Sequence, residues 1–139
     1  MLGDPRTMQV DPRYDDVVSE VTAFLEGRAT FAVSEGIAPE RIALDPGIGF
    51  GKTLEHNLEL LRRLDEIVAL GFPVLIGTSR KAFLGRLAGR EDPHDRVAAT
   101  VATNVLALER GATLFRVHDV APTADALAVA AATLRGDGA

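Results

Sequence analysis

The chain has 139 residues, 47% of them hydrophobic and 25% charged, a composition that fits one globular domain rather than a disordered chain. A formal net charge of −5 argues against nucleic-acid binding, and the lack of cysteine excludes disulfides, thiolate metal sites and cysteine nucleophiles. No apolar run approaches the ~20 residues that cross a bilayer, and the polar N-terminus is unlike a signal peptide. We therefore expect a cytoplasmic protein with neither a membrane nor a nucleic acid as partner.

Helical periodicity recurs along the chain. Apolar residues spaced three and four apart predict two N-terminal helices, around Val17, Val21, Phe24 and Leu25 and then around Leu58, Leu61, Leu64 and Val68. The segment 77–81 is expected to open another helix. The last two are expected over 93–109, where the valines at 97, 101 and 105 share a face with Leu108, and over 123–134.

Three short apolar runs at 41–45, 73–77 and 113–117 are predicted to be strands. They show little polar alternation, which is typical of strands covered on both faces. Gly71 and Gly111 stand where a helix would end before the next strand. The resulting order α-β-α-β-α-α-β-α indicates an α/β fold with parallel strands and right-handed crossovers.

Polar residues follow each predicted strand at its C-terminal end. They are Asp45, the segment 77–81, and Arg116, His118 and Asp119. In parallel α/β folds this edge of the sheet carries the ligand site. The sequence therefore predicts one site built from three loops.

The glycine-rich segment 45–53 admits two interpretations. Its Gly51-Lys52-Thr53 end matches a phosphate-binding P-loop, but Pro46 replaces the first glycine, and proline has no N–H and a fixed φ. The alternative is that Asp45 accepts hydrogen bonds from the amino and ring N–H groups of a heterocycle. Asp45 could equally cap the turn through backbone amides.

Cationic side chains in the other two loops suggest an anionic ligand. Arg80 and Lys81 are expected in the first turn of a helix, where cations oppose the helix dipole, so a functional reason for them is favoured. Arg116 and His118 are two apart on a strand and should point to the same face, where they could hold a phosphate or pyrophosphate. A structural Arg–Asp pair is the alternative.

Together these blocks resemble the pterin-binding family, and within it the dihydropteroate synthases. The matching blocks are 1–9, 45–53 with 56–58, 77–81 with 83–85, and 116–120. They correspond in order to the loop after the fifth strand and to the sixth-, seventh- and eighth-strand motifs of the family. The resemblance covers nearly the whole chain, and it implies the C-terminal part of a (β/α)8 TIM barrel, with strands six to eight and flanking helices in a partial domain over 1–139.

The resemblance implies a pterin site and its residues. Asp45 would bind the amino-pyrimidine edge of the pterin, and Lys81 would contact the ring atoms from across the pocket. Phe50 and Gly77 would shape the slot, and Arg116 would pack against the pterin face.

The other two substrate groups are assigned in the same way. Arg116 with His118 would hold the departing pyrophosphate, and Ser79, with Arg80 nearby, would face the carboxylate of p-aminobenzoate. The implied reaction condenses a pterin pyrophosphate with p-aminobenzoate to give dihydropteroate in folate biosynthesis.

The chain is shorter than the ~250 residues of a complete barrel. The resemblance implies that magnesium serves the full enzyme through a region missing here, with no metal ligand in this segment. It also implies a homodimer, or association with a missing N-terminal half. We expect the isolated chain to be poorly stable, because an open barrel exposes sheet edges, and inactive, because half of the pocket is missing. A P-loop-like nucleotide-binding protein, or a non-catalytic half-barrel from a truncated gene, are the alternatives.

Overall fold

The structure is a computed structural model that describes residues 4–136. Its elements are α1 (Val17–Ser34), η1 (Pro39–Arg41), α2 (Leu54–Arg62), α3 (Leu64–Val68), β1 (Leu75–Ile76), α4 (Ala82–Ala88), η2 (Pro93–Arg96), α5 (Val97–Glu109), β2 (Leu114–Phe115) and α6 (Val120–Arg135). Within the described range, no helix is both long and apolar enough to span a membrane.

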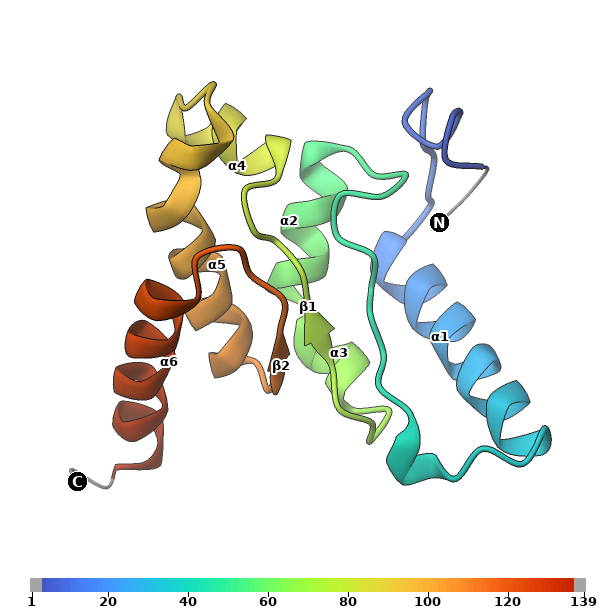
Figure 1. The fold of residues 1–139 in the computed structure, drawn as a ribbon. Coiled ribbons are helices and arrows are strands. Elements are labelled where there is room, and N and C mark those ends of the chain that lie inside the picture. The colour runs from blue at the N-terminus through green and yellow to red at the C-terminus, as the bar shows by residue number, and fades with distance from the viewer. Residues whose placement is uncertain (1–3, 137–139) are drawn as a thin grey trace.

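Three chain segments run parallel at the centre of the molecule (Figure 1). β1 pairs with β2 in the register Leu75↔Leu114, and Leu44 forms a parallel bridge to Val74 on the other side of β1. The prediction of an α/β fold with parallel strands is confirmed. The strands are shorter than predicted. Continuous pairing covers two residues in each of the runs 73–77 and 113–117, and the run 41–45 contributes only the bridge at Leu44.

One face of this small sheet is buried and the other is not. Val74 and Ile76 are fully buried and point to the side of the helices, whereas Leu114 is 41% exposed. Leu75, the register partner of Leu114, is half-buried. The prediction that the strands are covered on both faces is therefore wrong for the described residues, since helices pack against one face only.

The core lies between the sheet and the N-terminal helices. Its fully buried members include Val18, Leu60, Leu64, Ile67 and Ile76. Burying each such side chain contributes ~1.5–3 kcal/mol. This packing fixes α1, α2 and α3 against β1 and so positions the loop that follows the Leu44 segment.

The two N-terminal helices differ from their predicted form. Phe24, expected on the apolar face of α1, is 59% exposed, because the buried stripe runs through Val21 and Leu25. The single helix predicted over 58–68 is divided at Arg63, whose backbone (φ −108°, ψ 31°) leaves the helical region. The Arg63 guanidinium binds Asp16 at the start of α1, so the break joins three helices.

Gly71 and Gly111 both have a left-handed backbone, with φ of +84° and +96°. A Cβ at position 111 would lie 2.9 Å from Cγ1 of Val68, whereas one at position 71 would meet nothing within 4 Å. The two glycines therefore share a left-handed backbone conformation, but only Gly111 lacks room for a Cβ.

Alanine at either position should lower the free energy of unfolding, by about 1–2 kcal/mol for the backbone alone. Gly111→Ala should cost more than Gly71→Ala, because it must also displace Val68. Urea unfolding of both variants measures the difference. Equal losses would contradict the steric role of Gly111.

Candidate functional site

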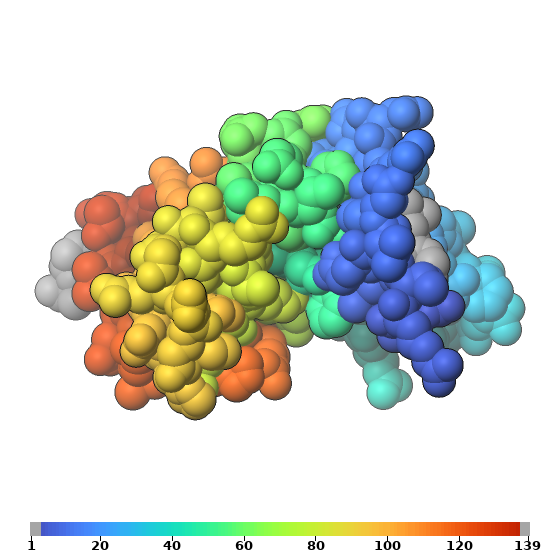
Figure 2. All heavy atoms as spheres, turned by 90° about the horizontal axis from the view of Figure 1, so that it is seen from above, coloured from blue at the N-terminus to red at the C-terminus, as the bar shows by residue number. Residues whose placement is uncertain are grey.

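The loops that follow Leu44, β1 and β2 lie together at one end of the sheet (Figure 1). Parallel strands end at a common edge, so this placement follows from the sheet itself. The loops span 45–53, 77–81 and 116–119, which are the segments predicted to form the site. Figure 2 views this end and shows a hollow between the blue N-terminal segment and the yellow segment around α4.

The loop 45–53 uses its backbone amides internally. Gly47 N donates to Oδ1 of Asp45 at 2.7 Å, and Gly49 N donates to Oδ1 of Asn57 at 2.6 Å. Phe50 N donates to Gly47 O at 3.1 Å. A P-loop presents such amides to phosphate oxygens, so this geometry disfavours the P-loop interpretation. The turn-capping role of Asp45 is real and uses one of its carboxylate oxygens.

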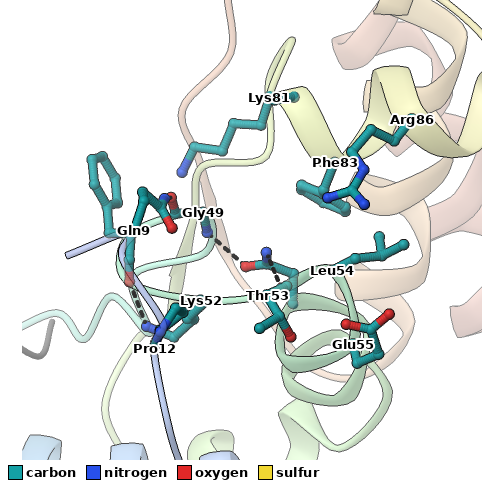
Figure 3. A pocket seen from close by; sticks show the side chains of 13 residues that line it. Gln9, Pro12, Gly49, Lys52, Thr53, Leu54, Glu55, Lys81, Phe83 and Arg86 are labelled. Atoms are coloured by element: carbon teal, nitrogen blue, oxygen red, sulfur yellow. Dashed lines mark hydrogen bonds between the residues drawn. The ribbon is translucent and has the colours of Figure 1, made fainter. Parts of the chain in front are cut away.

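Both lysines of the chain reach this loop. Lys52 is only 6% exposed, and its Nζ donates to Phe50 O at 3.1 Å. Nζ of Lys81 donates to Ile48 O and stands 4.5 Å from the centre of the Phe50 ring (Figure 3). A cation over an aromatic face is attracted by the ring quadrupole. Both lysines thus stabilise the loop 45–53 by donating hydrogen bonds to its backbone carbonyls.

Burial lowers the pKa of Lys52 to about 8, although the nearby Asp45 carboxylate opposes this shift. Burial also lowers the pKa of Lys81, with Asp45 opposing and Arg116 adding to the effect. Removing an ammonium from water disfavours its charged form, which explains both directions. Asp45 and Arg116 therefore both act electrostatically on Lys81, which links the three loops at this edge of the sheet.

Two cavities adjoin the loop. One of about 780 Å³ is lined by Gln9, Phe50, Lys81, Phe83 and Arg86, among others (Figure 3). A second, of about 450 Å³, lies between α1 and Asp45. A Cβ added at Gly77 would meet nothing within 4 Å, so the backbone there is open to close approach by a ligand.

Ser79, His118 and Arg116 form a chain of hydrogen bonds. Arginine can only donate, so the 3.1 Å contact from Arg116 Nη1 makes His118 Nε2 an acceptor. The proton of a neutral ring then sits on Nδ1, which lies 2.8 Å from Ser79 Oγ. Ser79 Oγ also accepts from His118 N at 3.0 Å. Because Ser79 Oγ accepts both bonds, its own hydrogen is left to be donated to a ligand.

The Arg80 guanidinium makes a two-pronged ion pair with Asp119, at 3.0 Å and 2.6 Å. This hydrogen bonding raises the pKa of Arg80 and lowers that of Asp119. The structural Arg–Asp pair considered for this region thus forms with Arg80, not Arg116. Arg80 and Lys81 precede α4, which begins at Ala82, so the prediction that they occupy its first turn is wrong.

Several polar residues that position the loops were not singled out from the sequence. Thr78 Oγ1 contacts Thr103 Oγ1 at 2.8 Å and Asn104 Oδ1 at 3.3 Å, and Arg80 N donates to Thr100 Oγ1 at 3.0 Å. Thr100 and Asn104 are fully buried on α5, whereas its valines are only half-buried. Threonine and asparagine at helical spacing within an otherwise apolar helix were the available signal.

No group of three His, Cys, Asp or Glu side chains is placed to hold a metal ion within residues 4–136. The expectation that residues outside this segment hold magnesium in the full enzyme stays a prediction.

Comparison with known proteins identifies the class. The family model described as "Pterin binding enzyme" matches residues 1–118. The chain belongs to this family. Among curated proteins it is 52% identical over 128 residues to the dihydropteroate synthase of Neisseria meningitidis serogroup C, covering 91% of this chain and 45% of that protein. These matches confirm the resemblance to dihydropteroate synthases.

Solved structures of dihydropteroate synthases are also similar to this chain. The dihydropteroate synthase of Thermus thermophilus in complex with 4-aminobenzoate is 56% identical, with a TM-score of 0.88 over 93% of this chain and 52% of that chain. The same enzyme in complex with 6HMPPP gives the same identity and score, covering 93% and 51%. The chain thus has the α/β fold of these TIM-barrel enzymes and spans about half their length.

Lys52 provides a test of the site's electrostatics. We expect its amine to titrate near pH 8, well below the ordinary 10.5, because its charged form is buried. Lysine-selective isotope labelling with NMR detection should resolve just two side-chain amines, and Lys52→Met assigns them. Titration of both at or above 10.5 would contradict the burial.

The same shift predicts a pH dependence of stability. Between about pH 8 and 10.5 the unfolded chain binds a proton that folded Lys52 has lost, so the free energy of unfolding should rise with pH. Lys52→Met should flatten that rise in urea unfolding.

Proposed function

We propose that this chain forms the C-terminal part of a dihydropteroate synthase barrel, strands six to eight, and carries part of its active site. The reaction joins a pterin pyrophosphate to p-aminobenzoate and releases pyrophosphate. The observation that carries the proposal is the meeting of Asp45, Lys81 and Arg116 at one sheet edge in a chain 56% identical to a solved dihydropteroate synthase.

The pterin is proposed to bind between the loops 45–53 and 77–81. Asp45 is exposed, and a carboxylate oxygen beyond the one that caps its turn suits the two N–H donors of an amino-pyrimidine. Lys81 and Phe50 form one wall of the site, and the open space at Gly77 allows the flat ring to approach the backbone.

Pyrophosphate is proposed to leave toward Arg116 and His118. The guanidinium suits phosphate oxygens, and its contact with His118 places both groups on one face. Ser79 has a free hydroxyl hydrogen for the carboxylate of p-aminobenzoate, and Arg80 contributes positive charge beside it even while paired with Asp119.

The reaction requires that both substrates are held in position and that the charge on the leaving pyrophosphate is stabilised. The bond between the pterin methylene carbon and its oxygen breaks, and the electron pair leaves with pyrophosphate. The arylamine then attacks the ring-stabilised cation and loses a proton. Cations aimed at the leaving group and fixed positions for both substrates supply this catalysis without a strong base.

Two partners belong to the same proposal. The half-exposed sheet face with Leu75 and Leu114 suits an N-terminal half that completes the barrel, in which residues outside this chain would hold magnesium. The groove between α5 and α6, where Val129 is 69% exposed, suits a second copy in a homodimer.

Asp45→Asn tests the pterin site. Asparagine keeps an oxygen for Gly47 N, so the turn should survive, but it loses the charge that binds two donors. Calorimetric titration with pterin pyrophosphate should show binding to the parent chain and at least tenfold weaker binding to the variant.

Asp65→Asn is the matched control, because Asp65 is exposed on α3 away from the loops. Equal affinity of the parent and the Asp45→Asn chain would remove Asp45 from the site. A parent chain that binds no pterin pyrophosphate would count against the proposed function.

The purified 139-residue chain should not form dihydropteroate by itself, because it spans about half the length of the solved synthases and supplies only part of the proposed active site. Product formation from pterin pyrophosphate and p-aminobenzoate, followed by chromatography, is the measurement. Turnover by the chain alone would show that the N-terminal half is dispensable.

A further inference from the structure

Arg96, the last residue of η2, binds backbone carbonyls from two different segments. Its Nη1 donates to Arg80 O at 2.9 Å and its Nε donates to Arg90 O at 3.1 Å. Its Nη2 donates to Glu91 O. One guanidinium thus ties the loop before α4 to the turn after it.

The backbone conformation of Arg80 requires stabilisation by such hydrogen bonds. Its φ is +58°, a left-handed conformation that is strained for a residue with a Cβ. A conformation of this kind persists only where its surroundings over-determine it. Here Arg80 N donates to Thr100 Oγ1 and Arg80 O accepts from Arg96, so residues at the start of α5 hold both polar groups of one residue.

Helix α4 leaves room for this guanidinium. A Cβ at Gly85 would lie 2.4 Å from Arg96 Nε and 2.4 Å from Arg90 O. Glycine is less favourable than alanine inside a helix, so its presence in α4 is explained by the passage of the Arg96 side chain.

The neighbours of Arg80 carry the site. Ser79 contacts His118 at 2.8 Å, and Lys81 crosses to the loop 45–53. A rotation of the Arg80 backbone toward an ordinary conformation would swing these two side chains away from their partners. The direction of both side chains therefore depends on the conformation of one residue.

We propose that Arg96 is a positioning residue of the site, which holds the Arg80 carbonyl so that Ser79 and Lys81 face the ligand. Arg96 touches no proposed substrate, and its effect passes through the backbone. The expected effect of Arg96 on ligand binding rests on the proposed function. Its expected effect on the His118 ring does not.

The test compares Arg96→Gln and Arg96→Lys with Arg90→Gln. Lysine keeps the charge but lacks the planar fork that spans several carbonyls. Arg90 is an exposed arginine whose carbonyl, rather than its side chain, takes part, so Arg90→Gln is the matched control. Thr100→Val removes the other hold on Arg80 and serves as a second variant should an Arg96 variant fail to fold.

The first readout is independent of substrate. Ring ¹⁵N NMR of His118 should show the Nδ1-protonated form in the parent and in Arg90→Gln. That signature should be lost in the Arg96 variants and in Thr100→Val, and exchange of the Arg80 amide should quicken at least tenfold.

The second readout is calorimetric affinity for pterin pyrophosphate, expected to fall roughly tenfold or more in the Arg96 variants and not in Arg90→Gln. Variants that retain the parent's His118 signature and Arg80 exchange rate would overturn the inference. A parent chain that shows the His118 signature but binds no pterin would overturn the proposed function and leave the positioning role standing.

Discussion

Backbone hydrogen bonds on both sides of β1 hold three segments in parallel register. Leu75 N donates to Leu44 O at 2.8 Å, and Arg116 N donates to Ile76 O at 3.0 Å. These bonds bring the ends of the segments to one edge, although the segments are about thirty to forty residues apart. The polar groups at 45, 77–81 and 116–119 lie within a few residues of that edge, so the sheet decides which of these side chains can meet.

Charge at this edge runs against the balance of the whole chain. The net charge is −5, yet Lys52, Lys81 and Arg116 gather near a single carboxylate, Asp45. Burial makes such a cluster costly, which the lowered pKa of Lys52 expresses. A bound anion would offset that cost, which is consistent with the pyrophosphate group of the proposed substrate.

The sequence predicted the order of helices and strands and the three loops that meet, because apolar periodicity and the edge rule for parallel sheets are local signals. It did not predict the exposure of Phe24 or the break at Arg63, which depend on how helices pack and pair. Sequence spacing could not indicate that Arg96 binds the carbonyl of Arg80, since every residue has a carbonyl. The family resemblance added roles for the site residues, not the contacts that orient them.

The placement of both lysines at one loop has a consequence for covalent chemistry. Apart from the N-terminal amine, acylating or aldehyde reagents find primary amines only at Lys52 and Lys81. An amine with a pKa of about 8 is uncharged, and therefore nucleophilic, in a far larger share of molecules at neutral pH than an ordinary lysine. Reagents that mark surface lysines elsewhere would in this protein react beside the candidate site, so a bound ligand that covers either lysine would protect it from modification.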